Sequence, residues 1–433
     1  MPPTSSRGTS SIAGSSVSSD EDSRDRRRAE SEPEAFDHRR RLHYHHHPFP
    51  LSTSSTSADD LLAASALSST LLPLFPPVSA AWAYGSGVFS QENQGNSKNN
   101  SSSSPRRSVD LLLAVADPRS WHEQNLRGNP AHYSSLARSF PLLLRSGGIS
   151  WLADNVGPGV WFNSGVRVNV GGGGAGEEEE NEEKSSSSFL TIKYGVFSER
   201  ALLSDLETWR ELYLAGRLQK PTLRLPPLST GIDFDSKKLE RGLEGNTAGA
   251  LAAALLLLPA TFSHSRLLST LVSLSYSGDV RVAAAAEDPR KVEKIVRGTG
   301  RRRLDALYSG HLPSSSFASS ISSPSSPLSS VVASAAGLIP LCNGNAWAQD
   351  PRRGARRELV ELLPERVRRK VEKSSSSSSF LSSYSSSFSS PSPSSPPLFA
   401  SSVRAALAST VRSSSARAAL LGIVSAGPAG AVS

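Results

Sequence analysis

The sequence predicts a mixed α/β (α+β) protein, and three patterns carry the prediction. Residues 109–115 are apolar on both sides of one aspartate, which is typical of a buried central strand. Residues 199–214 place leucine and aromatic side chains at helical spacing, as an amphipathic helix does. Residues 237–310 are mainly helical in pattern. We therefore expect a strand-containing domain followed by a smaller helical one.

Several long segments have too few apolar residues to fold. Ser, Pro, Gly, Asn or charge of one sign dominate residues 1–57, 92–107, 171–188, 313–331 and 373–402. Such segments bury too little apolar surface to offset the entropy lost on ordering. We expect a disordered basic tail at 1–57, insertions at 92–107 and 171–188, and a mostly low-complexity linker at 313–402. The remainder, roughly 270 residues, suffices for one catalytic domain at 58–235 and a companion at 236–312.

Charge and cysteine content narrow the function classes. The chain of 433 residues carries a formal net charge of +8, which favours anionic partners such as nucleic acid, nucleotides or acidic lipid. Its single cysteine, Cys342, excludes both a disulfide framework and a cysteine metal cage. The longest apolar run, residues 248–259, is broken by proline and falls short of the ~18–20 residues that a transmembrane helix needs.

The first elements lead to a glycine-serine turn. Residues 59–72 begin with aspartates and predict a helix, which prolines 73, 76 and 77 end. Residues 80–84 predict a short strand that runs into Gly85 and Ser86. Glycine tolerates positive φ and lets the backbone approach phosphates, while a serine hydroxyl can donate to them. We therefore expect Tyr84, Gly85 and Ser86 to bind a nucleotide triphosphate.

Asp110 lies inside the apolar strand 109–115. A buried carboxylate is costly unless it is paired or binds a metal, so Asp110 predicts a Mg²⁺ ligand, with a salt-bridged structural aspartate as the alternative. His122 and His132 follow in a polar and aromatic segment. Lone histidines are more often packing residues, and both are secondary candidates.

Basic residues follow on the later elements. Residues 151–170 predict a turn into a β-rich segment and 189–196 a strand, in which alternation places Lys193 on the face opposite its neighbours. The helix at 199–214, with Ser198 as its cap, leads into a loop that carries Arg217 and Lys220. All three cations are candidates for phosphate binding, with Lys193 also a catalytic candidate beside Asp110.

Two helical regions complete the pattern. Residues 237–310 predict three helices and a short extended piece near 279–282, a compact lid or winged-helix-like unit. Residues 403–427 predict a basic amphipathic helix, typical of helices that lie on an anionic membrane surface. The alternative is an ordinary helix docked on the core.

Together these segments resemble one family, the mitochondrial phosphatidate cytidylyltransferases, also called translocator assembly and maintenance proteins. The resemblance covers about 75–310 and 403–427. The motifs that carry it are 83–89, Val109-Asp110 with Val115 and Asp117-Pro118, Trp121-His122 with Asn125-Leu126, His132-Tyr133-Ser134, 193–196, Asp205-Leu206 with Trp209, 212–221, 256–259, 274–279, and Val411-Arg412 with Ser414-Ser415 and Gly422-Ile423.

The resemblance implies a nucleotidyltransferase domain, a winged-helix-like domain and a C-terminal membrane-binding helix. It further implies Mg²⁺-dependent conversion of CTP and phosphatidic acid to CDP-diacylglycerol and pyrophosphate. The implied place is the matrix side of the inner mitochondrial membrane, as a peripheral protein that supplies cardiolipin synthesis. Leu112 stands where the wider nucleotidyltransferase pattern has a second carboxylate, so Asp205 or Asp279 is the expected second metal ligand. Leu421 stands where the family usually has lysine.

Two other functions compete with this one. A nucleotidyltransferase with another acceptor, such as nucleic acid or a protein hydroxyl, would be expected to interleave base-stacking aromatics with basic patches. The core sequence has no such pattern, so we expect no nucleic-acid partner. A catalytically silent, membrane-associated assembly factor would have no reason to bury Asp110.

Overall fold

The computed structural model describes residues 58–85, 87–89, 108–139, 147–169, 189–227, 234–284, 288–297, 299–313, 327–342, 345–377 and 398–426. The expected tail at 1–57 and the insertions at 92–107 and 171–188 lie outside these ranges, as does Ser86.

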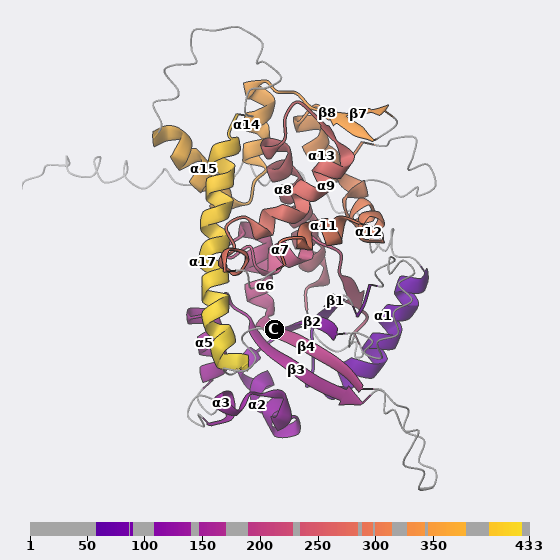
Figure 1. Cartoon of the computed structure of the whole chain (residues 1–433), viewed down its shortest axis with the longest axis vertical. Coiled ribbons are helices and arrows are strands. Elements are labelled where there is room, and N and C mark those ends of the chain that lie inside the picture. The colour runs from indigo at the N-terminus through magenta and orange to yellow at the C-terminus, as the bar shows by residue number, and fades with distance from the viewer. Residues whose placement is uncertain are drawn as a thin grey trace, which may run out of the picture. The chain divides into compact units, whose positions relative to one another are not determined.

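A mixed five-stranded sheet organises the first half of the described chain, in the order β3-β4-β2-β1-β5 (Figure 1). Its strands are β1 (Ala80–Tyr84), β2 (Ser108–Val115), β3 (Trp161–Asn169), β4 (Phe189–Ser198) and β5 (Leu223–Leu225). β2 and β4 are parallel, and the other neighbours are antiparallel. The strands expected at 80–84, 109–115 and 189–196 are thus confirmed, and so is the mixed fold class, while the β-rich segment expected within 151–170 holds β3 after the short helix α5 (Gly148–Asn155).

Alternation along β2 divides its side chains between two hydrophobic clusters. Val109, Leu111 and Leu113 pack in one cluster with α1 (Ala58–Leu71) and with Trp121 of α2 (Pro118–Gly128). Leu112 and Ala114 face the other cluster, with residues of α6 (Glu199–Thr208) and α8 (Ser236–Leu257). The central strands are therefore covered on both faces, as their apolar sequences predict.

The helix expected over 199–214 is shorter than its pattern indicated. Ser198 caps α6 by accepting the N–H of Ala201 at 3.1 Å, but α6 stops before Trp209, which takes a left-handed φ of 52°. Leu212 is also left-handed, with φ 51°, before the short helix α7 (Leu214–Leu218) begins. The leucine spacing did not reveal this break because the same side chains, Leu212 and Leu214 among them, remain buried.

The helical part shares a core with the sheet. α8 supplies Ala250–Leu256 to the larger cluster, and α9 (His264–Ser273) begins at Ser263, which caps it as expected. β6 (Thr261–Ser263), α11 (Lys291–Val296) and α12 (Thr299–Tyr308) complete this part. The extended piece expected near 279–282 is instead a short helix, α10 (Val280–Ala283), because the Asp279 side chain caps it by accepting the Arg281 N–H.

The linker expected over 313–402 is wrong for residues 327–377. These residues form α13 (Pro327–Ala335), β7 (Ile339–Leu341), β8 (Ala346–Ala348), α14 (Arg353–Glu361) and α15 (Glu365–Ser377), with β8 pairing to β6. Trp347, Leu359 and Val367 are buried in the main core. The apolar residues between the serine-rich tracts at 313–331 and 373–402 thus form a folded segment. The composition of 313–402 as a whole did not predict it.

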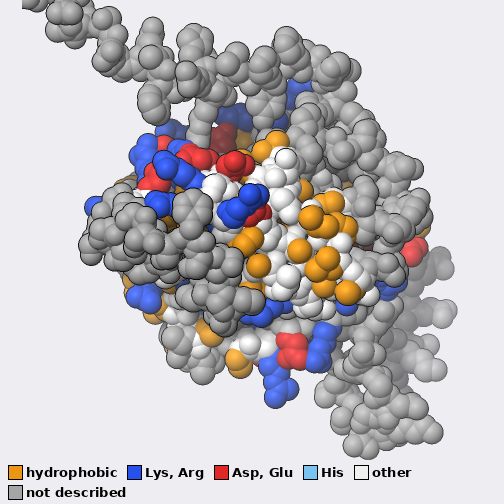
Figure 2. Space-filling model, turned by 90° about the horizontal axis from the view of Figure 1, so that it is seen from above, with side chains coloured by type: hydrophobic (Ala, Val, Ile, Leu, Met, Phe, Trp, Pro, Cys, Tyr) orange, Lys and Arg blue, Asp and Glu red, His pale blue; other side chains and the backbone are white. Residues whose placement is uncertain are grey.

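Figure 2 looks onto the end of the molecule where β7 and β8 lie in Figure 1. Hydrophobic side chains gather on part of this face (Figure 2). The large exposed apolar residues of α13 and β7 include Val331, Ile339 and Leu341.

The last helix, α17 (Ala400–Ala426), confirms the helix expected at 403–427. The amphipathic pattern suggests an apolar face exposed for a membrane, but most of that face packs on the protein. Val403, Leu407 and Val411 are buried in the main core, and α17 runs along one side of the protein from α15 to β3 (Figure 1). The alternative, a helix docked on the core, therefore describes this face. No helix among the described residues has the length and apolar character needed to cross a bilayer.

Candidate functional site

A pocket opens where the sheet, the helical part and α17 meet. Its walls come from β1, β2, β3 and β4, from the segment 212–220 that includes α7, from residues 275–281, from Lys291 and from α17. The lining residues are Tyr84, Asp110, Leu112, Phe162, Lys193, Leu212, Tyr213, Leu214, Gly216, Arg217, Lys220, Ser275, Tyr276, Asp279, Arg281, Lys291, Val411, Ser414 and Ser415. Segments far apart in the sequence thus build one site.

Strand register places three candidates in one row. Tyr84 is paired with Asp110 across β1 and β2, and Asp110 with Lys193 across β2 and β4. Directly paired residues project on the same face of a sheet, and all three line the pocket. The register therefore brings together Asp110 and Lys193, two residues that the sequence indicated separately.

Gly85 allows the first strand to end close to the carboxylate of Asp110. Its φ is +95°, and a Cβ at this position would lie 3.0 Å from Asp110 Oδ2. Any side chain here would be both strained and crowded against that oxygen. The glycine therefore keeps space open in front of Asp110, and Ser86 lies outside the described residues.

Asp110 lies among positive charges. Burial raises the pKa of its carboxyl, while Lys193, Arg217 and Lys291 act in the opposite direction. Among the described residues no group of three or more His, Cys, Asp or Glu side chains forms a metal cage. A single carboxylate still fits Mg²⁺ bound with a nucleotide, because that ion usually takes one or two carboxylates and completes its shell with phosphates and water.

Aromatic rings hold the expected phosphate-binding cations. The Arg217 guanidinium lies over the Tyr84 ring, 3.9 Å from its centroid, and Lys193 Nζ lies 5.3 Å from the Phe162 ring centroid. Lys220 Nζ lies 4.2 Å from the Tyr276 ring centroid and donates to Ser275 Oγ at 2.6 Å. Such contacts orient a cation. The pocket thus collects the three expected cations, and Arg281 and Lys291 join them.

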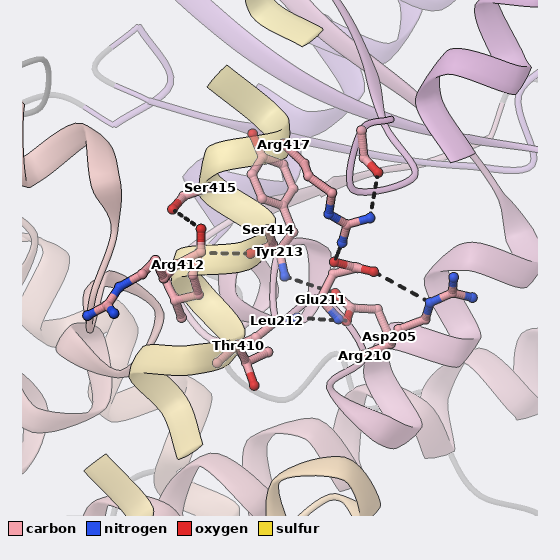
Figure 3. A network of polar contacts seen from close by, with 12 residues as sticks. Asp205, Arg210, Glu211, Leu212, Tyr213, Thr410, Arg412, Ser414, Ser415 and Arg417 are labelled. Carbon is pink, nitrogen blue, oxygen red and sulfur yellow. Dashed lines mark hydrogen bonds and ion pairs between the residues drawn. The ribbon is translucent and has the colours of Figure 1, made fainter. Parts of the chain in front are cut away.

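Asp205, a candidate second metal ligand, does not line the pocket. Its two carboxylate oxygens accept four backbone N–H bonds, from Glu211 and Leu212 at 2.8 Å and from Tyr213 and Ala215 at 3.0 Å (Figure 3). The side chain is buried, which raises its pKa, and the N–H bonds oppose that shift. Asp205 therefore fixes the loop between α6 and α7, and the expectation of metal binding is corrected.

Asp279, the other candidate, lines the pocket but already has partners. Its oxygens accept Arg281 Nε at 3.1 Å and Arg281 Nη2 at 2.7 Å, and they cap α10. Burial alone would raise the pKa of Asp279, but the bonds from Arg281 outweigh it and hold the pKa below its usual value. Asp279 is thus an arginine partner and not a metal ligand in this arrangement.

His122 and His132 lie outside the pocket, in a buried polar network beneath β4. His122 Nδ1 is 2.9 Å from the Tyr133 hydroxyl, and His132 Nδ1 is 3.0 Å from the Tyr194 hydroxyl. Burial lowers the pKa of His122 to about 3, so its ring is neutral at physiological pH. Tyr194 follows Lys193 on the opposite face of β4, so the histidines have a packing role.

α17 contributes a wall that sequence reasoning did not assign to the site. Val411, Ser414 and Ser415 line the pocket, and Arg417 forms an ion pair with Glu211 (Figure 3). Arg417 also donates to the Gly157 carbonyl at 3.1 Å. The helix is thereby joined to the same loop that Asp205 holds. Only the family motif Val411-Arg412 with Ser414-Ser415 could have indicated that this helix belongs to the site. A local sequence pattern predicts a helix but not which distant residues it contacts.

Comparison with known proteins gives a consistent result. The family model described as "Phosphatidate cytidylyltransferase, mitochondrial" matches residues 67–433. Curated proteins of the same description are similar: one from Schizosaccharomyces pombe is 37% identical over 220 residues, 51% of this chain and 46% of that protein. One from Drosophila melanogaster is 39% identical over 222 residues, 51% and 56% respectively. One from Homo sapiens is 36% identical over 228 residues, 52% and 42%.

The matched regions span about half the length of these curated relatives. The family model, in contrast, extends over most of the present chain and includes every residue that lines the pocket. By this match, the chain belongs to the mitochondrial phosphatidate cytidylyltransferase family.

Proposed function

We propose that this protein is a phosphatidate cytidylyltransferase, which makes CDP-diacylglycerol and pyrophosphate from CTP and phosphatidic acid. One observation carries the proposal: in a member of this family, the row Tyr84, Asp110 and Lys193 opens into a pocket that also contains Arg217, Lys220, Arg281 and Lys291. Among the described lining residues, five cations against two carboxylates, Asp110 and Asp279, leave an excess of positive charge that suits a polyphosphate substrate.

The reaction needs positioning more than a base. An oxygen of the phosphatidic acid phosphate attacks the α-phosphorus of CTP, and the bond from that phosphorus to the bridging oxygen breaks as pyrophosphate leaves. Because the attacking phosphate is already anionic, the protein mainly aligns the two groups and neutralises charge. Lys193, Arg217 and Lys220 would bind the triphosphate, and the turn at Gly85 would let its phosphates approach β1 and β2.

We propose Asp110 as the residue that holds Mg²⁺. The ion, when bound with CTP, would neutralise charge on the transferring and leaving phosphates. With Asp205 and Asp279 engaged elsewhere, Asp110 is the protein carboxylate best placed to contact it. Lys193 beside Asp110 would offset the charge that develops on the leaving group.

We further propose a location on the matrix side of the inner mitochondrial membrane, as a peripheral protein in cardiolipin synthesis. The curated relatives carry "mitochondrial" in their names. A lipid substrate with two acyl chains requires contact with a bilayer, and exposed Leu420 and Ile423 near the end of α17 offer apolar groups for it. Anionic lipid suits the positive net charge.

The test is an assay with labelled CTP, Mg²⁺ and phosphatidic acid in detergent micelles. Wild-type protein should form labelled CDP-diacylglycerol. Asp110→Asn should reduce the rate by at least about 100-fold, a loss typical when one electrostatic contact to a transition state is removed. Asp59→Asn, an exposed aspartate on α1, is the matched control and should keep full activity.

Absence of lipid product from folded wild-type protein would overturn the proposal. Retained nucleotide binding would then favour an enzyme with another acceptor, and loss of Mg²⁺-dependent CTP binding would favour a silent assembly factor.

A further inference from the structure

Arg281 lines the pocket in a fixed position. The Asp279 carboxylate receives Nε and Nη2 of Arg281 at 3.1 and 2.7 Å, as a fork on two oxygens. The Asp279 side chain is 1% exposed, whereas that of Arg281 is 34% exposed and lines the pocket. A buried carboxylate thus holds a guanidinium toward open space.

α17 fixes the turn that carries this pair. Gly278 has φ +82°, and a Cβ there would lie 2.8 Å from the Ala408 carbonyl oxygen. The Ser415 hydroxyl accepts the backbone N–H of Val280 at 3.1 Å. The position of Arg281 therefore depends on α17, through a close backbone contact and one serine.

The cations of the pocket are held by different elements. Lys193 and Arg217 lie over aromatic rings of the sheet, those of Phe162 in β3 and Tyr84 in β1. Arg281 is instead held by Asp279, on a turn that the backbone of α17 and Ser415 contact. The pocket thus contains a cation whose support comes from α17 and not from the sheet assigned to the triphosphate.

The chemistry requires such a separate cation. In the reaction proposed above, an anionic phosphate must approach a triphosphate that is itself strongly negative. Repulsion between them is reduced when the incoming phosphate has its own positive partner. A guanidinium is suited to this role because it remains charged and has five N–H donors, more than the two that bind the Asp279 side chain.

Resting on the proposed function, we propose that Arg281 binds the phosphate of the lipid acceptor, and that Asp279 and Ser415 are positioning residues that hold Arg281 in place. The recognised group is a phosphomonoester on a glycerolipid. The wall formed by residues 278–281 and α17 is then the acceptor side of the pocket, and the sheet with Arg217 and Lys220 is the nucleotide side.

Steady-state kinetics with water-soluble dihexanoyl phosphatidic acid, free of micelles, separates this role from membrane contact. Arg281→Ala should raise KM for the lipid by about tenfold or more, the loss typical of a hydrogen bond to a charged group, with KM for CTP changed less than about twofold. Arg281→Lys should restore part of the loss. Asp279→Asn and Ser415→Ala should raise the same KM by smaller factors, and Ser415→Thr should restore it.

Arg266→Ala is the matched control, because Arg266 is an exposed arginine on α9 outside the pocket and its side chain should not affect either KM. A rise in KM for CTP with an unchanged KM for the lipid would overturn the proposal and assign Arg281 to the nucleotide. An unchanged KM for both substrates would also overturn it.

Direct binding keeps this inference separate from the proposed reaction. If wild-type protein forms no CDP-diacylglycerol, the proposed function fails, but calorimetry with dihexanoyl phosphatidic acid still measures the acceptor site. Wild-type protein should bind the lipid and Arg281→Lys should bind it more weakly, and equal binding by the two would overturn the inference. If Arg281→Ala does not fold, lipid binding by Arg281→Lys is compared with that by wild type instead. CTP binding then checks that Arg281→Lys is folded. Inorganic phosphate in place of the lipid shows whether the site takes the phosphate alone.

Discussion

Replacement of Asp205 by asparagine tests whether this buried side chain is a structural clamp. Asp205 accepts four backbone N–H bonds of 2.8 to 3.0 Å. An amide of the same shape keeps one oxygen for two of them and turns its NH₂ group toward the other two. Each buried N–H without an acceptor costs about 1–3 kcal/mol, so two cost about 2–6 kcal/mol, and relief of the buried charge offsets part of this. We expect a loss of about 3 kcal/mol in the free energy of unfolding.

Urea unfolding without Mg²⁺, followed by circular dichroism, measures this loss. Glu207→Gln is the matched control, since Glu207 is exposed on the same helix and its charge should contribute less than about 0.5 kcal/mol. KM for CTP should also rise in Asp205→Asn, because Arg217 follows the clamped loop. The reasoning fails if Asp205→Asn is within 1 kcal/mol of wild type without Mg²⁺. Unchanged stability with a raised Mg²⁺ requirement would return Asp205 to the metal site.

Two further substitutions test the site and its support. Gly216→Ala should raise KM for CTP several-fold with little change in protein yield. The new Cβ would lie 2.5 Å from the Cβ of Ser275, whose hydroxyl accepts a hydrogen bond from Lys220. Unchanged kinetics would contradict this. His122 has a folded pKa of about 3, below its usual 6.5, so the unfolded chain binds more protons between these values and stability falls as pH drops below 6.5. From pH 7 to 5 wild type should therefore lose about 2 kcal/mol more than His122→Gln in urea unfolding, and parallel losses would exclude a buried neutral His122.

Local sequence patterns were enough to single out Asp110 and Lys193, two charged residues that the sheet contributes to the pocket. Asp110 interrupts an otherwise apolar strand, and alternation along 189–196 places Lys193 on a defined face. These predictions needed only the two-residue period of a strand and the cost of a buried charge. The parallel pairing of β2 with β4 then sets Asp110 opposite Lys193.

The rest of the site depends on contacts that no local pattern encodes. Asp205 and Asp279 were expected as metal ligands because Leu112 stands where the wider nucleotidyltransferase pattern has a second carboxylate. The actual partners of Asp205 are backbone N–H groups of the loop after α6 and of α7, and that of Asp279 is an arginine two residues away. The Asp-Val-Arg spacing at 279–281 is a local signal for the Asp279–Arg281 pair, since an aspartate that caps a helix can reach an arginine in the first turn of that helix. Ser415, 136 positions beyond Asp279 in the sequence, has no such signal.

The position of α17 has a consequence for how a lipid substrate reaches the pocket. Ser415 lines the pocket, and Ile423 lies eight residues later on the same helix, a rise of about 12 Å. Leu420 and Ile423 are 59% and 50% exposed, whereas Leu421 between them is buried. One rigid helix thus joins an exposed apolar end to the acceptor wall.

This geometry predicts different losses with two forms of one substrate. Replacing both Leu420 and Ile423 by serine should reduce the rate with long-chain phosphatidic acid in anionic vesicles by about tenfold, since two apolar side chains would no longer enter the bilayer. The rate with dihexanoyl phosphatidic acid should stay within twofold, because neither residue lines the pocket. Vesicle co-sedimentation should fall with the first rate, and Val331→Ser with Ile339→Ser, a distant exposed pair, is the control. Equal losses with both substrates would mean that the end of α17 supports the pocket itself and does not contact the membrane.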